Sequence, residues 1–375
     1  MIKNPIFPII SLFFGILISN LILSFFLSDI KINTEEDLLN PGTSTLFEKI
    51  NNKKIHCKDS RDINECFDSA KSSGFNENVL WLGNSQIHAV NQYKEGQPAA
   101  PSILHNNLRR DSLNLITMSF GNANLQEHMV QYAHIVNRLS LKYILVGIVF
   151  DDTREDGIRK NVYDFINEDL KTKKLIESYD IGRELIKKSN YDTSELSLQK
   201  ENEKNLQNKI EPVLNEGLGS ISFIWKMRSE IAYRYFVFLR RVRNYIFNIN
   251  PSTIRKIIPD TYKRNLSSLE MMMDISSKNN ILMIAYIAPI RSDIKIPYDL
   301  DEYNNFKITV KNMSLKYPNV FYENLEDIIK SEYWGLKNST TVGEELELDF
   351  MHFNADAHKV LSEKLYNIIN TKNKN

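Results

Sequence analysis

The sequence predicts an α/β fold in which a parallel sheet is wrapped by helices. Three observations carry this prediction. Short apolar runs recur at Val79–Leu82, Leu115–Met118 and Tyr143–Phe150. Helical stretches alternate with them, which is the pattern of a parallel sheet with helical crossovers. Polar turns follow the runs directly, and ligands of such sheets bind at the carboxyl ends of the strands.

The composition is that of a folded protein. The 375 residues are 42% hydrophobic and 25% charged, which excludes a disordered, collagen-like or multi-span membrane protein. Lys+Arg and Asp+Glu both number 47, so the formal net charge is zero. The basic excess of a general nucleic-acid binder is missing, and we expect no nucleic-acid partner.

The N-terminal segment 1–28 is expected to anchor the protein in a membrane. Ile6–Leu27 carries no charge. As a helix it would extend roughly 33 Å, enough to cross the hydrocarbon core of a bilayer. Lys3 precedes the run, and acidic residues dominate after it, so the positive-inside rule leaves the N-terminus in the cytoplasm. A cleaved signal peptide is the rival interpretation, but its apolar region should be shorter and end in a small-x-small site.

Residues 29–77 are interpreted as a juxtamembrane stalk with short helices. Cys57 and Cys66 flank the polar segment KDSRDINE and could form a disulfide in an oxidising compartment. Two unrelated thiols, or a weak metal site with His56, are the alternatives. Two cysteines alone cannot make a structural zinc site.

The remaining residues, 78–370, are expected to form the α/β domain. After the three runs, further strands are predicted at Ile281–Ile287 and Val320–Tyr322. Helices are predicted over three stretches with helical patterns: Ser85–Tyr93, Gln126–Leu139 and Ala355–Ile369.

A helical insertion at about 152–270 interrupts this alternation. Within it, Ser222–Ile249 interleaves aromatic and basic residues. This stretch is either a core-packing helix with a solvated basic side or a helix that binds a membrane interface or an anionic glycan.

Three pieces of the chain carry candidate chemistry. Ser85 follows the first strand at Gly83-Asn84, where the N–H groups at the start of a helix would stabilise negative charge. Gly121, after the second strand, could present a second N–H to an oxyanion. Asp349 and His352 form a D-x-x-H turn before the last helix, in which the carboxylate can fix the imidazole tautomer. A serine N-cap, a turn glycine and a surface Asp–His pair are the bland alternatives for each alone.

In this order the motifs resemble the SGNH (GDSL-like) hydrolases, and among them the membrane-anchored envelope branch of teichoic-acid D-alanine transfer and alginate O-acetylation proteins. Leu82-Gly83-Asn84-Ser85-Gln86, Ser119-Phe120-Gly121-Asn122 and Asp349-Phe350-Met351-His352 resemble three of the family's blocks. The resemblance covers roughly 78–150 and 278–370. It implies a flavodoxin-like three-layer α/β/α sandwich.

The resemblance also implies a catalytic triad of Ser85, His352 and Asp349, with Ser85 and Gly121 as oxyanion donors. Asn84 stands where the family usually has Asp. The third block lacks its Asn, because Asp151-Asp152 follows the third strand. Asn122 or Asn124 is the expected substitute donor.

The implied function is that of an extracytoplasmic serine esterase or O-acyltransferase acting on cell-envelope polysaccharide, single-pass in the bacterial cytoplasmic membrane. The expected partners are an acylated glycan or acyl-carrier donor and a multi-span acyltransferase, and no metal or other cofactor is needed. The alternatives are a catalytically degenerate assembly or glycan-binding protein, and an esterase acting on lipids.

Overall fold

A computed structural model describes residues 43–46, 49–50, 53–57, 62–189, 235, 238–239, 241–247, 253–338 and 346–373. The chain divides into two compact units. The larger comprises Asn40–Asn190, Asn250–Ser339 and Gly343–Asn375 and contains the whole of the sheet and site described below. Of the smaller, which includes Tyr191–Ile249, the structure describes only short helical pieces between residues 235 and 247.

A six-stranded parallel sheet forms the centre of the larger unit, in the order β10-β9-β8-β5-β7-β4. Apart from the edge strand β4, this is the order 2-1-3-4-5 of flavodoxin-like sheets. The strands are β4 (His56–Cys57), β5 (Glu77–Gly83), β7 (Leu113–Ser119), β8 (Leu141–Ile148), β9 (Leu282–Ile287) and β10 (Val320–Asn324). Most of their residues are buried, as expected for a parallel sheet covered on both faces.

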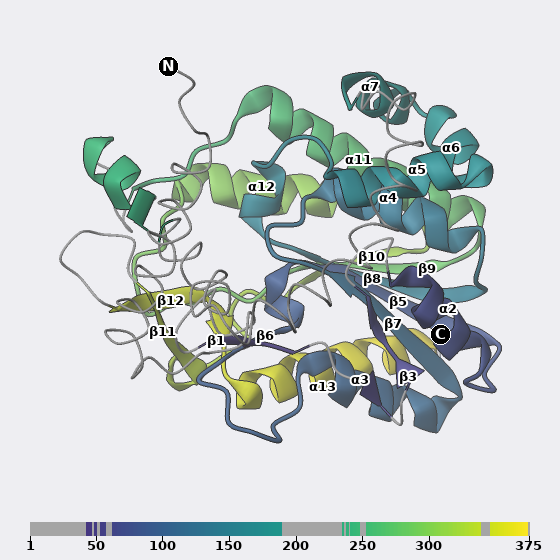
Figure 1. The fold of residues 1–375 in the computed structure, drawn as a ribbon, viewed down its shortest axis with the longest axis horizontal. Coiled ribbons are helices and arrows are strands. Elements are labelled where there is room, and N and C mark those ends of the chain that lie inside the picture. Colours follow the sequence, from purple (N-terminus) through teal and green to yellow (C-terminus); the bar gives the residue numbers. More distant parts are fainter. Residues whose placement is uncertain are drawn as a thin grey trace, which may run out of the picture. The chain divides into compact units, whose positions relative to one another are not determined.

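Helices cover both faces of the sheet (Figure 1). Alternate strand residues divide between two cores: Leu80 and Leu82 belong to one, Val79 and Trp81 to the other. The first core is closed by α2 (Ile63–Lys71), α4 (Leu125–Val136), α5 (Lys160–Glu168), α6 (Leu170–Glu177), α7 (Asp180–Lys188), α11 (Pro259–Lys278) and α12 (Leu300–Ser314). The second is closed by α3 (Ala100–Leu108) and α13 (Ala355–Asn373).

Short strands and turns complete this unit. Antiparallel pairs join β1 (Thr43–Thr45) to β6 (Ala89–Asn91), β2 (Lys49–Ile50) to β3 (Lys53–Lys54) and β11 (Trp334–Asn338) to β12 (Leu346–Phe353). The 3-10 turns are η1 (Ser85–Ile87), η2 (Arg109–Asp111), η3 (Phe150–Thr153) and η4 (Ser331–Tyr333).

One side-chain pair spans the middle of the sheet. Trp81 on β5 donates its indole N–H to the Tyr286 hydroxyl on β9 at 2.9 Å, although β8 lies between them. Gly147 on β8 allows this crossing, because a Cβ there would lie 2.5 Å from the Tyr286 hydroxyl oxygen. The glycine is therefore required by a close approach and not by a turn.

The α/β class and the five predicted strands are confirmed, with ends shifted by a few residues. The third strand ends at Ile148, because Phe150–Thr153 turns into η3. The helix predicted over Ser85–Tyr93 is wrong. Only Ser85–Ile87 is helical, and Ala89–Asn91 then pairs as β6 with β1.

The segment interpreted as a stalk belongs partly to the α/β unit. Strand β4 pairs with β7, and α2 packs Phe67 and Ala70 into the first core. Cys57 and Cys66 are joined by a disulfide that links β4 to α2. Residues 53–57 and 62–77 are therefore not a separate stalk. A two-residue strand carries too little pattern to be recognised in a sequence.

The predicted insertion also contributes to the layers around the sheet. Helices α5, α6 and α7 lie within 152–270, α11 begins within it and ends at Lys278, and all four contact the first core. Among the described residues, no helix is both long and apolar enough to span a bilayer. The predicted anchor Ile6–Leu27 lies outside them, as does most of Ser222–Ile249.

Candidate active site

The first candidate residue, Ser85, begins a single 3-10 turn at the carboxyl end of β5. Asn84 precedes it in extended conformation, and its side-chain oxygen accepts the Gln86 N–H at 3.0 Å. This is the arrangement of an N-cap, which holds the turn in place after the strand ends. Ser85 itself is half-buried, while its neighbours on both sides are buried.

A chain of two hydrogen bonds joins Ser85 to the last strand of the unit. Ser85 Oγ lies 2.9 Å from His352 Nε2, and His352 Nδ1 lies 2.9 Å from Asp349 Oδ2. An ionised carboxylate only accepts, so the imidazole proton belongs on Nδ1. Nε2 is then left to accept the Ser85 hydroxyl proton. The structure thus brings together three residues from positions 85, 349 and 352.

A bulge in β12 presents the imidazole. Leu348 pairs with Leu336, and Phe353 pairs with Trp334, so the segment from Asp349 to His352 lies opposite the single residue Gly335. Asp349 Oδ1 accepts the backbone N–H groups of Met351 and His352 at 2.9 and 3.1 Å. The predicted D-x-x-H turn is therefore a bulge within a strand, and the carboxylate organises it.

Asp349 is fully buried. Burial by itself would raise the pKa of this carboxyl, but His352, the nearby Lys337 and the Met351 N–H outweigh it and lower the pKa below its usual value. Asn91 Nδ2 also approaches Asp349 Oδ2 at 3.5 Å and donates to the Leu336 carbonyl at 3.0 Å. Asp349 is therefore ionised at neutral pH, as the orienting member of such a chain must be.

Asp152 contacts the turn from the other side. Asp152 lies in η3, the turn that follows β8. Asn84 Nδ2 donates to its two carboxyl oxygens at 3.1 and 3.4 Å. Strands β5 and β8 are neighbours at the point where the strand order reverses, which is where such sheets bind ligands. Burial raises the pKa of Asp152 to about 8, although the Val149 and Asn84 N–H groups oppose this.

Gly121 and Asn122 follow β7, the other neighbour of β5. Strands β5 and β7 are in register at Gly83 and Ser119, so Ser85 and Gly121 each come two residues after a paired position. The backbone N–H groups of Ser85 and Gly121 donate to no acceptor within the part of the chain that the structure describes. Asn122 has a left-handed backbone with φ of 54°.

Arg159 holds this loop from outside. Its guanidinium donates to the Gly121 and Asn122 carbonyls at 3.0 and 2.9 Å and lies over the Phe120 ring. The Asn124 side chain accepts the Glu127 N–H, and its amide nitrogen donates one hydrogen bond to the Gly157 carbonyl. Asn124 is therefore engaged with α4 and with Gly157, and Asn122 is the substitute donor that we retain.

Three supporting residues escaped the sequence-based prediction. Gln86 donates from Nε2 to the Pro289 and Met351 carbonyls at 2.6 and 2.9 Å, which joins η1 to the bulge that carries His352. Asn91 and Asp152 were the others. Asp152 had a signal, because it follows a strand at the edge where ligands bind. Gln86 and Asn91 had none, since only tertiary contacts bring them to the site.

No family model matches the chain, and no curated protein matches it either.

Proposed function

We propose that the protein is an SGNH-type serine esterase or O-acyltransferase. The observation that carries the proposal is the continuous chain Ser85–His352–Asp349, with both hydrogen bonds at 2.9 Å and the carboxylate buried. The flavodoxin-like strand order and the position of Ser85 at the carboxyl end of a central strand support it.

In the proposed reaction, His352 Nε2 takes the Ser85 hydroxyl proton while Ser85 Oγ attacks an acyl carbonyl carbon. The carbonyl oxygen becomes an oxyanion, which the Ser85 and Gly121 N–H groups stabilise, with the Asn122 side chain as the third candidate donor. The tetrahedral intermediate collapses, the carbon–oxygen or carbon–sulfur bond to the leaving group breaks, and His352 Nε2 returns its proton to that group.

An acyl-serine remains. Water or a glycan hydroxyl then attacks it, giving up its proton to His352 Nε2, and Ser85 recovers that proton as the acyl group departs. Water as the acceptor makes the protein an esterase, and a glycan hydroxyl makes it an O-acyltransferase. The same groups serve both outcomes.

We place this activity outside the cytoplasm, on cell-envelope polysaccharide. The uncharged run Ile6–Leu27 supports a single-pass anchor in the bacterial cytoplasmic membrane. The Cys57–Cys66 disulfide supports an oxidising compartment. The proposed donor is an acylated glycan or acyl carrier, and a multi-span acyltransferase is the proposed membrane partner.

The test is labelling of the full-length chain in detergent with a fluorophosphonate, which reacts with an activated serine. We expect labelling of the wild type and none of Ser85→Ala or His352→Ala. Ser267→Ala, a half-exposed serine on α11, is the matched control and should label normally. Equal labelling of wild type and Ser85→Ala would end this proposal.

A non-catalytic glycan-binding or envelope assembly protein is the second candidate. The observation in its favour is that two acidic residues, Asp151 and Asp152, follow β8 where the resemblance calls for an amide donor. An unlabelled wild type that still binds envelope polysaccharide would establish this alternative.

An esterase acting on lipids is the third. In the smaller unit, the helical segment 241–247 exposes Tyr245 and Phe247 by 76% and 69%. Amphipathic segments with exposed aromatic and basic residues bind membrane interfaces. Hydrolysis that requires liposomes and ignores polysaccharide would favour this activity.

A further inference from the structure

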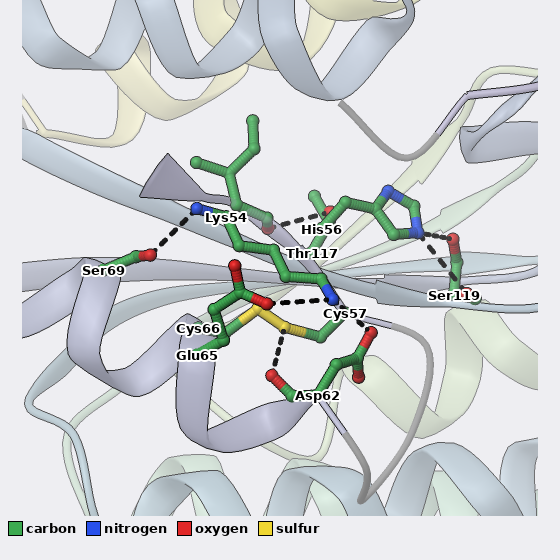
Figure 2. Close-up of a disulfide and its surroundings, with 10 residues drawn as sticks. Lys54, His56, Cys57, Asp62, Glu65, Cys66, Ser69, Thr117 and Ser119 are labelled. Atoms are coloured by element: carbon green, nitrogen blue, oxygen red, sulfur yellow. Dashed lines mark hydrogen bonds and ion pairs between the residues drawn. A yellow bond between two sulfur atoms is a disulfide. The ribbon is translucent and has the colours of Figure 1, made fainter. Parts of the chain in front are cut away.

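A second chain of hydrogen bonds lies buried beside the candidate site. His56 Nε2 lies 3.0 Å from Ser119 Oγ, and His88 Nδ1 lies 2.7 Å from the same oxygen. The two imidazole rings meet edge to face at 5.3 Å. All three side chains are buried, with exposed fractions of 1%, 0% and 3% for His56, Ser119 and His88. Figure 2 shows His56 reaching Ser119.

The geometry gives this chain a direction. His56 Nε2 also lies 3.4 Å from the Ser119 carbonyl oxygen, which can only accept. His56 therefore carries its proton on Nε2 and donates to Ser119. The Ser119 hydroxyl, having accepted one hydrogen bond, donates its own proton to His88 Nδ1. A serine is the residue type that can accept from one imidazole and donate to another.

The hydroxyl of Ser119 joins the two loops that carry the proposed oxyanion donors. Ser119 is the last residue of β7 and stands two residues before Gly121. His88 is the C-cap of η1, and its backbone N–H donates to the Ser85 carbonyl at 3.1 Å. One hydrogen bond of 2.7 Å thus spans from the end of β7 to the turn that contains Ser85.

The other end of the chain is firmly anchored. His56 belongs to β4, which is tied to α2 by the Cys57–Cys66 disulfide. Just before it, Lys54 of β3 donates its backbone N–H to Ser69 Oγ on α2 (Figure 2). On the other side of β4, Thr117 of β7 donates both its hydroxyl and its backbone N–H to the Ile55 carbonyl, one residue before β4. An edge strand of two residues would otherwise have little to hold it.

We propose that Ser119, fixed by His56, is a positioning residue that sets the separation of the Ser85 and Gly121 N–H groups. This role rests on the proposed serine chemistry. Losing it lets the two donors drift, and a displacement of about 1 Å in an active site costs on the order of 100-fold in rate. The chemical step slows, while substrate binding is preserved, because these three side chains are buried away from the surface.

The experiment compares two pairs of variants in the full-length chain, using fluorophosphonate labelling rates and kcat and KM for a soluble ester. Ser119→Ala should lower kcat and the labelling rate by about 10- to 100-fold with KM unchanged. Thr117→Val is the matched control. It removes another buried hydroxyl from the same strand, but the Thr117 amide keeps the Ile55 carbonyl. Its kcat should stay near the wild-type value.

The second pair of variants, at His56, tests the positioning role of Ser119 even if Ser119→Ala fails to fold. His56→Leu removes the donor, whereas His56→Gln keeps an N–H at a similar distance along the side chain. We expect a reduced kcat for His56→Leu and substantial recovery for His56→Gln. Equal kcat values for these two, or a wild-type kcat for a folded Ser119→Ala, would overturn the positioning role.

The outcomes also separate the two proposals. A wild type that is not labelled at Ser85 refutes the serine chemistry, and the positioning role with it. Labelling at Ser85 that proceeds equally fast in folded Ser119→Ala refutes the positioning role alone.

Discussion

Replacing Asp349 by asparagine should change the tautomer of His352, so that the imidazole proton moves from Nδ1 to Nε2. In the structure, Oδ1 of Asp349 accepts two backbone N–H groups, from Met351 and His352, and Oδ2 accepts His352 Nδ1–H. An asparagine can satisfy the two backbone donors only with its single amide oxygen. Its NH2 group must then face His352 Nδ1, which becomes an acceptor. The ring proton moves to Nε2, opposite the Ser85 hydroxyl.

The expected loss of kcat follows from this change of tautomer. With a proton on Nε2, His352 cannot take the proton of Ser85, so general-base catalysis is lost although the side chains keep their places. Loss of the correct tautomer in a serine–histidine–aspartate arrangement lowers kcat by about 10⁴-fold. That factor is about 5 kcal/mol in the activation free energy. KM should change little, because Asp349 is buried and does not face substrate.

The assay is the fluorophosphonate labelling rate and kcat of Asp349→Asn, beside a thermal unfolding curve that shows the variant is folded. Asp356→Asn, an exposed carboxylate in the first turn of α13, is the matched control and should behave as the wild type. If folded Asp349→Asn kept more than about a tenth of the wild-type rate, against the ~10⁴-fold loss expected, the tautomer argument would be refuted.

Three further predictions concern stability. Gly335→Ala should destabilise the fold by about 1–3 kcal/mol, measured by urea unfolding, because its Cβ would lie 2.0 Å from Asn91 Oδ1. Replacing both Cys57 and Cys66 by serine should cost about 2–3 kcal/mol in the same assay, since the disulfide closes a short loop in the unfolded chain. Asp152→Asn should change the pH dependence of unfolding: with the pKa raised from 3.8 to about 8, the folded wild type holds a proton that the unfolded chain releases. Wild-type stability relative to the variant should therefore fall as pH rises from about 4 to about 8, by at most about 1.4 kcal/mol per pH unit.

Each of these has its own control. Gly121→Ala serves as the stability control for Gly335→Ala, because a Cβ at Gly121 meets nothing within 4 Å and its unfolding midpoint should hardly move. The disulfide result would be contradicted by equal stability of the wild type with and without reductant. If the free energies of unfolding of wild type and Asp152→Asn differed by the same amount across pH 4–8, Asp152 would not be held protonated by burial.

Much of the central sheet could be predicted from local pattern. The runs at β5, β7, β8, β9 and β10 are nearly continuous and apolar, because strands covered on both faces need no polar side. The short turn and strand that follow β5 could not be predicted, and the local pattern favours a helix there instead. The apolar residues Ile87, Ala89 and Val90 are buried, but they are buried in η1 and the short strand β6. A helical pattern over so few residues does not exclude that arrangement.

The supporting residues show the same limit. Asn91 and Gln86 are ordinary polar residues in sequence, recognisable only by their contacts with Asp349 and with the Met351 carbonyl. Asp152 had a signal in its place after a strand, but its contact with Asn84 is visible only in the structure. His56 and His88 are equally uninformative until β4 joins the sheet beside β7. The hydrogen-bond partners of these five residues lie between 31 and 265 positions away along the chain. No local pattern in the sequence encodes such distant contacts.

By itself the sequence determined the parallel sheet, the carboxyl-end turns at Ser85 and Gly121, and the pairing of Asp349 with His352 three residues later. These depend on apolar runs and on close spacing, which act locally along the chain. Tertiary structure alone decided that His352 meets Ser85 across 267 positions, that a bulge opposite Gly335 presents it, and that Ser119 ties the two turns together. Those distances are set by strand order and register, which arise only when the whole sheet has packed against its helices.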